Sequence, residues 1–186
     1  MDVHVGSLDI LLTLAVVYSE NNAKQPDQSY TPTQLPAPTR QNKLQLQPNG
    51  DHYPSLVFEV AVTNEDRARL LEDACTKYFS IKTSVNVWVG IKIDRSVAGN
   101  EHFWVGWGRR KLLGTGLRLE QHTEDRDGQS TFLPVHLPAG NNLMGQIEIP
   151  STLVFQPKQV PAAIPPTFVV TLESVRGWII RGLLHS

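Results

Sequence analysis

The chain has 186 residues, of which 40% are hydrophobic and 19% are charged, and its formal net charge at pH 7 is −1. This length favours one folded domain, which we place over residues 1–186. The near-neutral charge excludes a strongly basic nucleic-acid coat protein, so any contact with a polyanion has to come from a local patch. The single cysteine, Cys75, excludes an internal disulfide and favours an intracellular location, in the nucleus or the cytoplasm.

An apolar run near the N-terminus, residues 8–17, is the first predicted element. It is too short to cross a bilayer, which takes about 20 apolar residues. No Lys or Arg precedes it and Asp9 interrupts it, so it does not fit a signal peptide. We therefore interpret it as a buried strand or helix, and we expect no membrane partner.

The second predicted element is a strand over residues 56–63, which follows a long proline-containing connection over residues 31–55. Both faces of this strand are mostly apolar, which predicts a central strand covered on both sides. Glu59 is the exception. Burying a carboxylate costs on the order of several kcal/mol of desolvation unless the carboxylate is paired or bound to a cation. The role of this carboxylate is the main question that the sequence raises.

A helix over about residues 65–79 and a strand over residues 85–93 come next. Thr63 or Asn64 is the expected helix cap, and apolar residues at helical spacing form one stripe along the helix. Strand, helix and strand in this order predict a βαβ unit, in which the two strands are parallel neighbours. Lys92 lies within the second strand of this unit.

Short strands separated by turns are predicted after residue 94, over residues 102–108, 117–122, 130–137 and 145–149. The proline-rich stretch 156–166 is typical of an extended linker. A closing helix is predicted over residues 171–184, with Thr171 as its cap. Its expected apolar face consists of Leu172, Val175, Trp178, Ile179 and Leu183. We thus expect a core over residues 8–95, a β-rich extension over 100–155, the linker and the closing helix.

Three residues in these elements suggest a site for phosphodiester chemistry. Asp27 follows Pro26 in a turn, Glu59 lies in one strand and Lys92 lies in the next. Two carboxylates from adjacent strands can hold Mg²⁺ or Mn²⁺, which bind oxygen ligands. Such an ion activates a bound water and stabilises charge on a scissile phosphate, while a nearby ammonium steadies the developing charge.

The segments KQPDQSYTP, PSLVFEVAVTNEDRARLLEDACTKYF and VNVWVGIKI, within about residues 20–95, resemble the PD-(D/E)XK nuclease superfamily. They are most similar to restriction-endonuclease-like families of filamentous fungi and to related bacterial endonucleases. The resemblance implies a restriction-endonuclease-like α/β fold, a mixed β-sheet core flanked by helices, with extra β-strands in the C-terminal half of this chain. It also implies Asp27 and Glu59 as metal ligands, Mg²⁺ or Mn²⁺ as cofactor and DNA as partner, and it leaves a homodimer open.

The sequence departs from the superfamily pattern at one position. The residue two places after Glu59 is Ala61, where the pattern has a lysine. Lys92 is the best replacement for the missing ammonium, and Lys77 is the second candidate. The period of a strand does not decide whether Lys92 and Glu59 share one face of the sheet.

Structural interpretations of the same residues remain open. Asp27 fits an ordinary turn residue, and Lys92 fits a lysine that extends from the end of a strand. Glu59 fits an ion pair with Arg67, Arg69 or Lys92. The basic residues 109–111 fit a solvated turn between two strands better than a phosphate contact.

Two functions follow from the sequence. The first is a Mg²⁺-dependent nuclease that hydrolyses DNA phosphodiester bonds through Asp27, Glu59 and Lys92. The second is a nuclease-like fold whose active site has decayed, which serves as a binding or interaction module. Ala61 favours the second.

Overall fold

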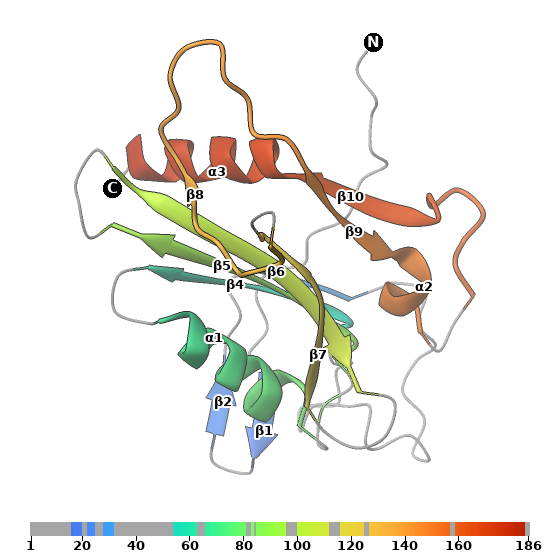
Figure 1. The fold of residues 1–186 in the computed structure, drawn as a ribbon. Helices are drawn as coiled ribbons and strands as arrows, with labels where there is room; N and C mark the ends of the chain where they lie inside the picture. The colour runs from blue at the N-terminus through green and yellow to red at the C-terminus, as the bar shows by residue number, and fades with distance from the viewer. Residues whose placement is uncertain are drawn as a thin grey trace, which may run out of the picture.

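A six-stranded mixed sheet forms the centre of the structure, a computed structural model (Figure 1). The structure describes residues 16–19, 22–24, 28–31, 54–62, 66–80, 83, 85–95, 100–111, 116–124, 127–156 and 159–184. The strands of the sheet are β3 (Gln28–Tyr30), β4 (Leu56–Val62), β5 (Val87–Asp94), β6 (His102–Arg110), β7 (Leu117–His122) and β8 (Leu133–Pro134). Their order is β3-β4-β5-β6-β7, with β8 paired to β6. Since β4 and β5 are parallel and the other pairs are antiparallel, the chain is a mixed α/β protein with a mostly antiparallel sheet.

The predicted βαβ unit is confirmed. Strand β4 leads into α1 (Arg67–Asp73), a π-helical turn η2 (Ala74–Tyr78) and then β5, which pairs with β4 in parallel. The expected cap was wrong, because Asp66 caps α1 by accepting a hydrogen bond from the backbone N–H of Arg69 at 2.7 Å. The π-helical turn was also not predicted, and it carries Tyr78 at its last position.

One face of the sheet is covered by α1 and η2. The hairpin of β1 (Val16–Ser19) and β2 (Asn22–Lys24) lies beyond this helix in Figure 1. The buried apolar residues on this side are Val57, Ala61, Leu70, Ala74, Tyr78, Phe79, Val85, Trp88 and Trp104. Helix α1 therefore buries its apolar stripe against alternate residues of β4, β5 and β6.

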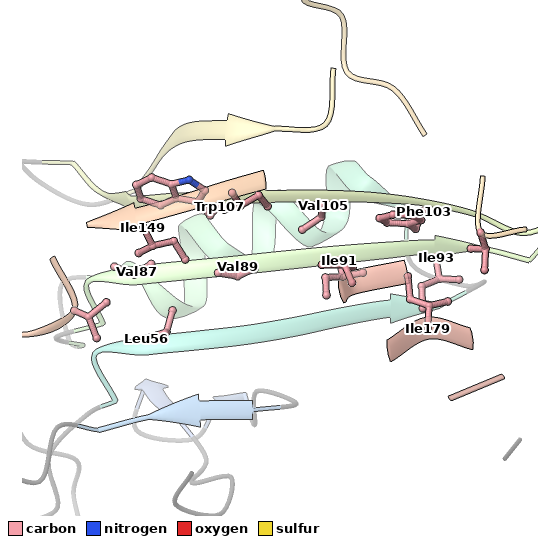
Figure 2. Packing of buried hydrophobic residues seen from close by; sticks show 14 of the residues in the cluster. Leu56, Val87, Val89, Ile91, Ile93, Phe103, Val105, Trp107, Ile149 and Ile179 are labelled. Carbon is pink, nitrogen blue, oxygen red and sulfur yellow. The ribbon is translucent and has the colours of Figure 1, made fainter. Parts of the chain in front are cut away.

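The opposite face of the sheet is covered by C-terminal elements. These are β9 (Gln146–Pro150), α2 (Ser151–Val154), β10 (Thr167–Thr171) and α3 (Leu172–Leu184), with β9 and β10 paired antiparallel. Figure 2 shows the apolar rows of β5 and β6 on this face, aliphatic on β5 and partly aromatic on β6, beside Ile149 and Ile179. The two faces thus carry two separate apolar clusters, with the sheet between them.

Several predictions for individual elements were wrong. The α3 side of β4 is not fully covered, because Val60 is 37% and Val62 is 40% exposed. Trp178 is 48% exposed and does not belong to the buried face of α3, which contains Val175 and Ile179. Arg109 and Arg110 belong to strand β6 rather than to a turn.

The C-terminal part contains two elements that the sequence did not predict, α2 and β10, while β8 is much shorter than expected. Thr171 does cap α3, since its Oγ1 accepts from the N–H of Ser174 at 3.1 Å.

The side chain of Gln121 in β7 attaches β9 to the sheet. It donates to the carbonyl of Gln146 at 2.8 Å and accepts from the N–H of Glu148 at 3.1 Å, as a neighbouring strand would.

Some predictions concern residues outside the described part of the chain. The apolar run over residues 8–17 is described only from residue 16 onward, where β1 begins. The long connection over residues 31–55 is described only at residue 31 and at residues 54–55. Across the described residues, no helix combines the length and the hydropathy needed to cross a bilayer.

An ion pair on α3 holds both ends of the loop between β8 and β9. The Glu173 carboxylate pairs with Arg176 and accepts from the N–H of Leu143 at 3.1 Å. Arg176 Nη1 also donates to the carbonyl of Val135 at 3.4 Å. Hydrogen bonds from Arg176 and from the Leu143 N–H lower the pKa of Glu173 below its ordinary value.

This lowered pKa predicts a pH dependence of stability. The unfolded chain binds a proton at Glu173 more readily than the folded chain does, so the contribution of this carboxylate is present above the ordinary glutamate pKa and is lost as the pH falls through the lower folded pKa. We expect Glu173→Gln to reduce the free energy of unfolding at pH 7, and the difference from wild type to shrink below about pH 4. Urea unfolding of wild type and Glu173→Gln at pH 7 and below about pH 4 measures this difference in the free energy of unfolding. A difference that does not change with pH would contradict this role of Glu173.

Candidate functional site

The parallel pairing of β4 and β5 brings Glu59 and Lys92 to the same face of the sheet. Glu59 pairs with Gly90, and Ala61 pairs with Lys92. Paired residues point to the same side, so Lys92 lies one diagonal position from Glu59, where long side chains approach each other. Both residues lie on the face that α1 and η2 cover, together with Val57 and Trp88. The sequence had left this common face undecided.

The Glu59 carboxylate is buried beneath the helix. Glu59 is 5% exposed, and its Oε2 accepts a hydrogen bond from the Tyr78 hydroxyl at 2.5 Å. The Tyr78 side chain is itself fully buried, and it reaches the carboxylate from the end of η2. A hydroxyl is therefore one of the groups that compensate the burial of this carboxylate.

Lys92 is equally buried, at 6% exposure. Its ammonium donates to the backbone carbonyl of the next residue, Ile93, at 3.1 Å. Two other cations expected near Glu59 have different partners. The Arg67 guanidinium lies over the ring of Trp104, 5.8 Å from its centroid, and Arg69 pairs with Glu72 at 3.0 Å.

The second candidate for the missing ammonium, Lys77, is engaged within its own helix. Its amine forms an ion pair with Asp73, one helical turn earlier. Ala61 stands on β4 at the position of the pattern lysine, and its side chain is buried in the α1 cluster. Neither of these positions therefore supplies an ammonium beside Glu59.

Asp27 lies outside the described residues, so its distance from Glu59 is not defined. Its sequence neighbour Gln28 begins β3 and pairs with Phe58, the residue before Glu59. Within the described ranges, no group of three or more His, Cys, Asp or Glu side chains is placed to hold a metal ion.

The sequence did not identify two features of this site. Tyr78 was not singled out from the sequence, although a tyrosine on the apolar stripe of a helix brings a hydroxyl that needs a partner when it is buried. Trp104, on β6 opposite Lys92, has Arg67 over its ring and His122 stacked against it at 6.4 Å between centroids. The sequence does not predict the pairing register of β6 with β5, which places Trp104 opposite Lys92.

The Glu59 carboxylate and the Lys92 ammonium are thus both closed from solvent on the α1 side of the sheet. Comparisons of the chain with protein-family models, with curated proteins and with solved structures found no significant match.

Proposed function

We propose that this chain is a catalytically inactive, nuclease-like domain that serves as a binding or interaction module. The fold we assign to it is of the restriction-endonuclease-like type. The order of β3, β4, α1 and β5, with an antiparallel pair followed by a parallel pair, supports this assignment.

The burial of Glu59 is the observation that carries this proposal. A carboxylate that holds a catalytic metal has to reach a phosphodiester bond and the water that attacks it. Glu59 is 5% exposed, lies beneath α1 and η2, and accepts a hydrogen bond from Tyr78. These contacts serve to compensate a buried charge and leave little access for a nucleic acid.

The absence of a lysine at the pattern position supports the same conclusion. Ala61 is buried against the helix, and Lys92, its neighbour on β5, donates to a backbone carbonyl. An ammonium that is buried in this way stands away from solvent, where a scissile phosphate would arrive. We infer that binding rather than hydrolysis is the activity of this site.

Plasmid nicking tests the proposal directly. We expect wild-type protein, incubated with supercoiled DNA and millimolar Mg²⁺ or Mn²⁺, to leave the plasmid intact, as Glu59→Gln does. Cleavage by the wild type that Glu59→Gln abolishes would overturn the proposal in favour of a nuclease. Equal cleavage by both proteins would point to a contaminating enzyme, and repurification to constant specific activity would then decide the result.

A Mg²⁺-dependent nuclease acting on DNA is the second candidate, and the common face of Glu59 and Lys92 favours it. In that case Asp27 and Glu59 would hold Mg²⁺ or Mn²⁺, and Lys92 would assist the attacking water. Thermal melting separates the two candidates, because an ion that binds only the folded state raises the melting temperature. The nuclease requires a rise with Mn²⁺ in the wild type that Asp27→Asn removes, whereas the inactive module shows no such rise.

A further inference from the structure

Strand β10 has one edge with which no described strand pairs. Its other edge pairs with β9, and the Gln121 side chain attaches β9 in turn to β7, so β10 is the outermost of these strands (Figure 1). The sequence of β10, TFVVT, contains no charge and no proline, and its pairing with β9 contains no bulge. These are the features that commonly keep an exposed edge from pairing, so β10 is suited to the addition of another strand.

The hydrogen bonds at both ends of the β9–β10 pair show which backbone groups face the open edge. The N–H of Ser151 donates to the carbonyl of Pro166 at 2.9 Å, and the N–H of Leu172 donates to the carbonyl of Gly145 at 3.1 Å. Bonded and non-bonded pairs alternate along an antiparallel ladder, so the even-numbered residues of β10 bond to β9. The N–H groups that point away from β9, for which the described residues provide no acceptor, are those of Thr167, Val169 and Thr171.

The sequence of β10 is complementary to itself in an antiparallel pair. Because the outward groups belong to odd-numbered residues, a second β10 pairs along its whole length only in the register centred on Val169. In that register the two Val169 residues exchange N–H···O=C bonds, and the N–H of each Thr171 reaches the carbonyl of the partner's Thr167. Phe168 stands opposite the partner's Val170. Aromatic–β-branched and Thr–Thr pairs are favourable cross-strand pairs, and no like charges meet.

We propose that two copies of this chain form a dimer by antiparallel pairing of their β10 strands around Val169. The Val169 side chain, which is 52% exposed, then lies on the two-fold axis. The strands form one sheet in the order β9-β10-β10-β9, and each copy uses its β10 edge once, so the assembly is closed at the dimer. This surface is separate from the candidate site, and the proposal does not rest on the proposed function.

The test compares wild type with Val169→Pro. Because the N–H of Val169 faces the open edge, proline removes a bond of the dimer and no bond to β9, and proline is tolerated at such edge positions. Sedimentation velocity from about 1 μM to about 1 mM covers the Kd of a small interface. We expect the wild type to pass from monomer to dimer over this range. Its Kd should rise at least about tenfold in Val169→Pro, because the bonds between the two Val169 residues are lost.

Val169→Ala is the matched control, since it keeps the backbone N–H and shortens the same exposed side chain. Its Kd should rise by no more than about fivefold, which corresponds to one cross-strand side-chain pair. An equal rise in Val169→Ala and Val169→Pro would assign the contact to the side chain and overturn the pairing of backbones.

Amide hydrogen exchange of the wild type needs no variant and so does not depend on the folding of Val169→Pro. The N–H groups of Val169 and Thr171 should exchange at least about tenfold more slowly at high than at low protein concentration, because only the dimer gives them acceptors. Those of Phe168 and Val170 should change little, since β9 already protects them in the monomer. Exchange at Val169 that does not depend on concentration would contradict the proposal.

Three results of sedimentation would also overturn it. A wild type that stays monomeric throughout would leave this edge to an extended segment of a different protein. A dimer with the same Kd in wild type and Val169→Pro would place the contact elsewhere on the molecule. Growth beyond the dimer would replace the closed two-fold pairing by open association. These measurements use neither DNA nor divalent ions, so the nicking assay decides the proposed function independently of them.

Discussion

Replacing Arg110 by methionine is expected to lower the free energy of unfolding by about 3 kcal/mol, the upper end of the range for losing hydrogen bonds to a charged group. The Arg110 side chain extends from β6 to the last residue of η2 and to the segment that follows it. It donates to the carbonyl oxygens of Tyr78, Phe79, Ser80, Thr83 and Val85 and to the Thr83 hydroxyl. Its removal takes a charged donor from all five carbonyls. Those of Tyr78, Phe79 and Ser80 keep a donor from Thr83 or Gly116, so the main cost falls on the carbonyls of Thr83 and Val85, because unpaired buried acceptors are costly.

Burial lowers the pKa of Arg110 through desolvation, but an arginine stays protonated in proteins, so the loss is one of hydrogen bonds and packing. Arg110→Lys is expected to recover only part of the stability, because an ammonium lacks the planar fork that serves several carbonyls at once. Urea unfolding measures both variants. Arg118→Met, at an exposed residue of β7, is the control and should change stability by less than about 0.5 kcal/mol.

The loss of Arg110 should also reach the candidate site. The turn that Arg110 holds begins directly after Tyr78, the residue whose hydroxyl bonds Glu59. Amide hydrogen exchange over residues 74–80 should therefore accelerate in Arg110→Met and not in Arg118→Met. A stability of Arg110→Met within 1 kcal/mol of wild type, about the size of one ordinary hydrogen bond, would show that water replaces the guanidinium.

Replacing Gly90 by alanine is expected to destabilise the protein by about 3 kcal/mol, the upper end of the range for overpacked cores. A β-carbon at Gly90 would lie 2.2 Å from Cη2 and Cζ2 of the Trp88 ring and 3.1 Å from Cδ2 of Leu70. The Trp88 ring extends along its own strand over Gly90 and is fully buried beneath α1. It has no room to move, so the methyl group displaces either the ring or the helix.

The direction of this effect is informative because alanine in a strand interior is otherwise no worse than glycine. Gly177→Ala in α3 is the matched control, since its β-carbon would meet only Arg181 Nη1 at 3.7 Å. The free energy of unfolding of Gly177→Ala should rise by about 0.5–1 kcal/mol, because alanine has a higher helix propensity than glycine. Chemical denaturation measures both, and an unchanged midpoint for Gly90→Ala would mean that the Trp88 ring does not occupy this place.

A double variant separates the clash from other effects. Trp88→Leu opens space over Gly90, so Gly90→Ala should cost much less in that background than in the wild type. Side chains in contact commonly show coupling energies of about 0.5–3 kcal/mol in such cycles. Additive effects would exclude a direct contact between the two side chains.

The sequence by itself determined the βαβ unit from hydrophobic periodicity. The strand over residues 56–63, the helix that follows and the strand over residues 85–93 are all present, and the two strands are parallel. A strand has a period of two residues and a helix one of 3.6, so these patterns report local structure directly. Thr171 as the cap of α3 was predicted for the same reason, because capping depends on neighbouring residues alone.

Only the tertiary structure decided how these elements share the candidate site. The pairing of Ala61 with Lys92 places the lysine on the face of Glu59, and a register shifted by one residue would have placed it on the other face. The π-helical turn brings Tyr78 to Glu59. Strand β6 brings Arg110 to the end of that turn and Trp104 opposite Lys92, near the end of β5. Such contacts join residues far apart in the chain, and packing of whole elements rather than local periodicity fixes them.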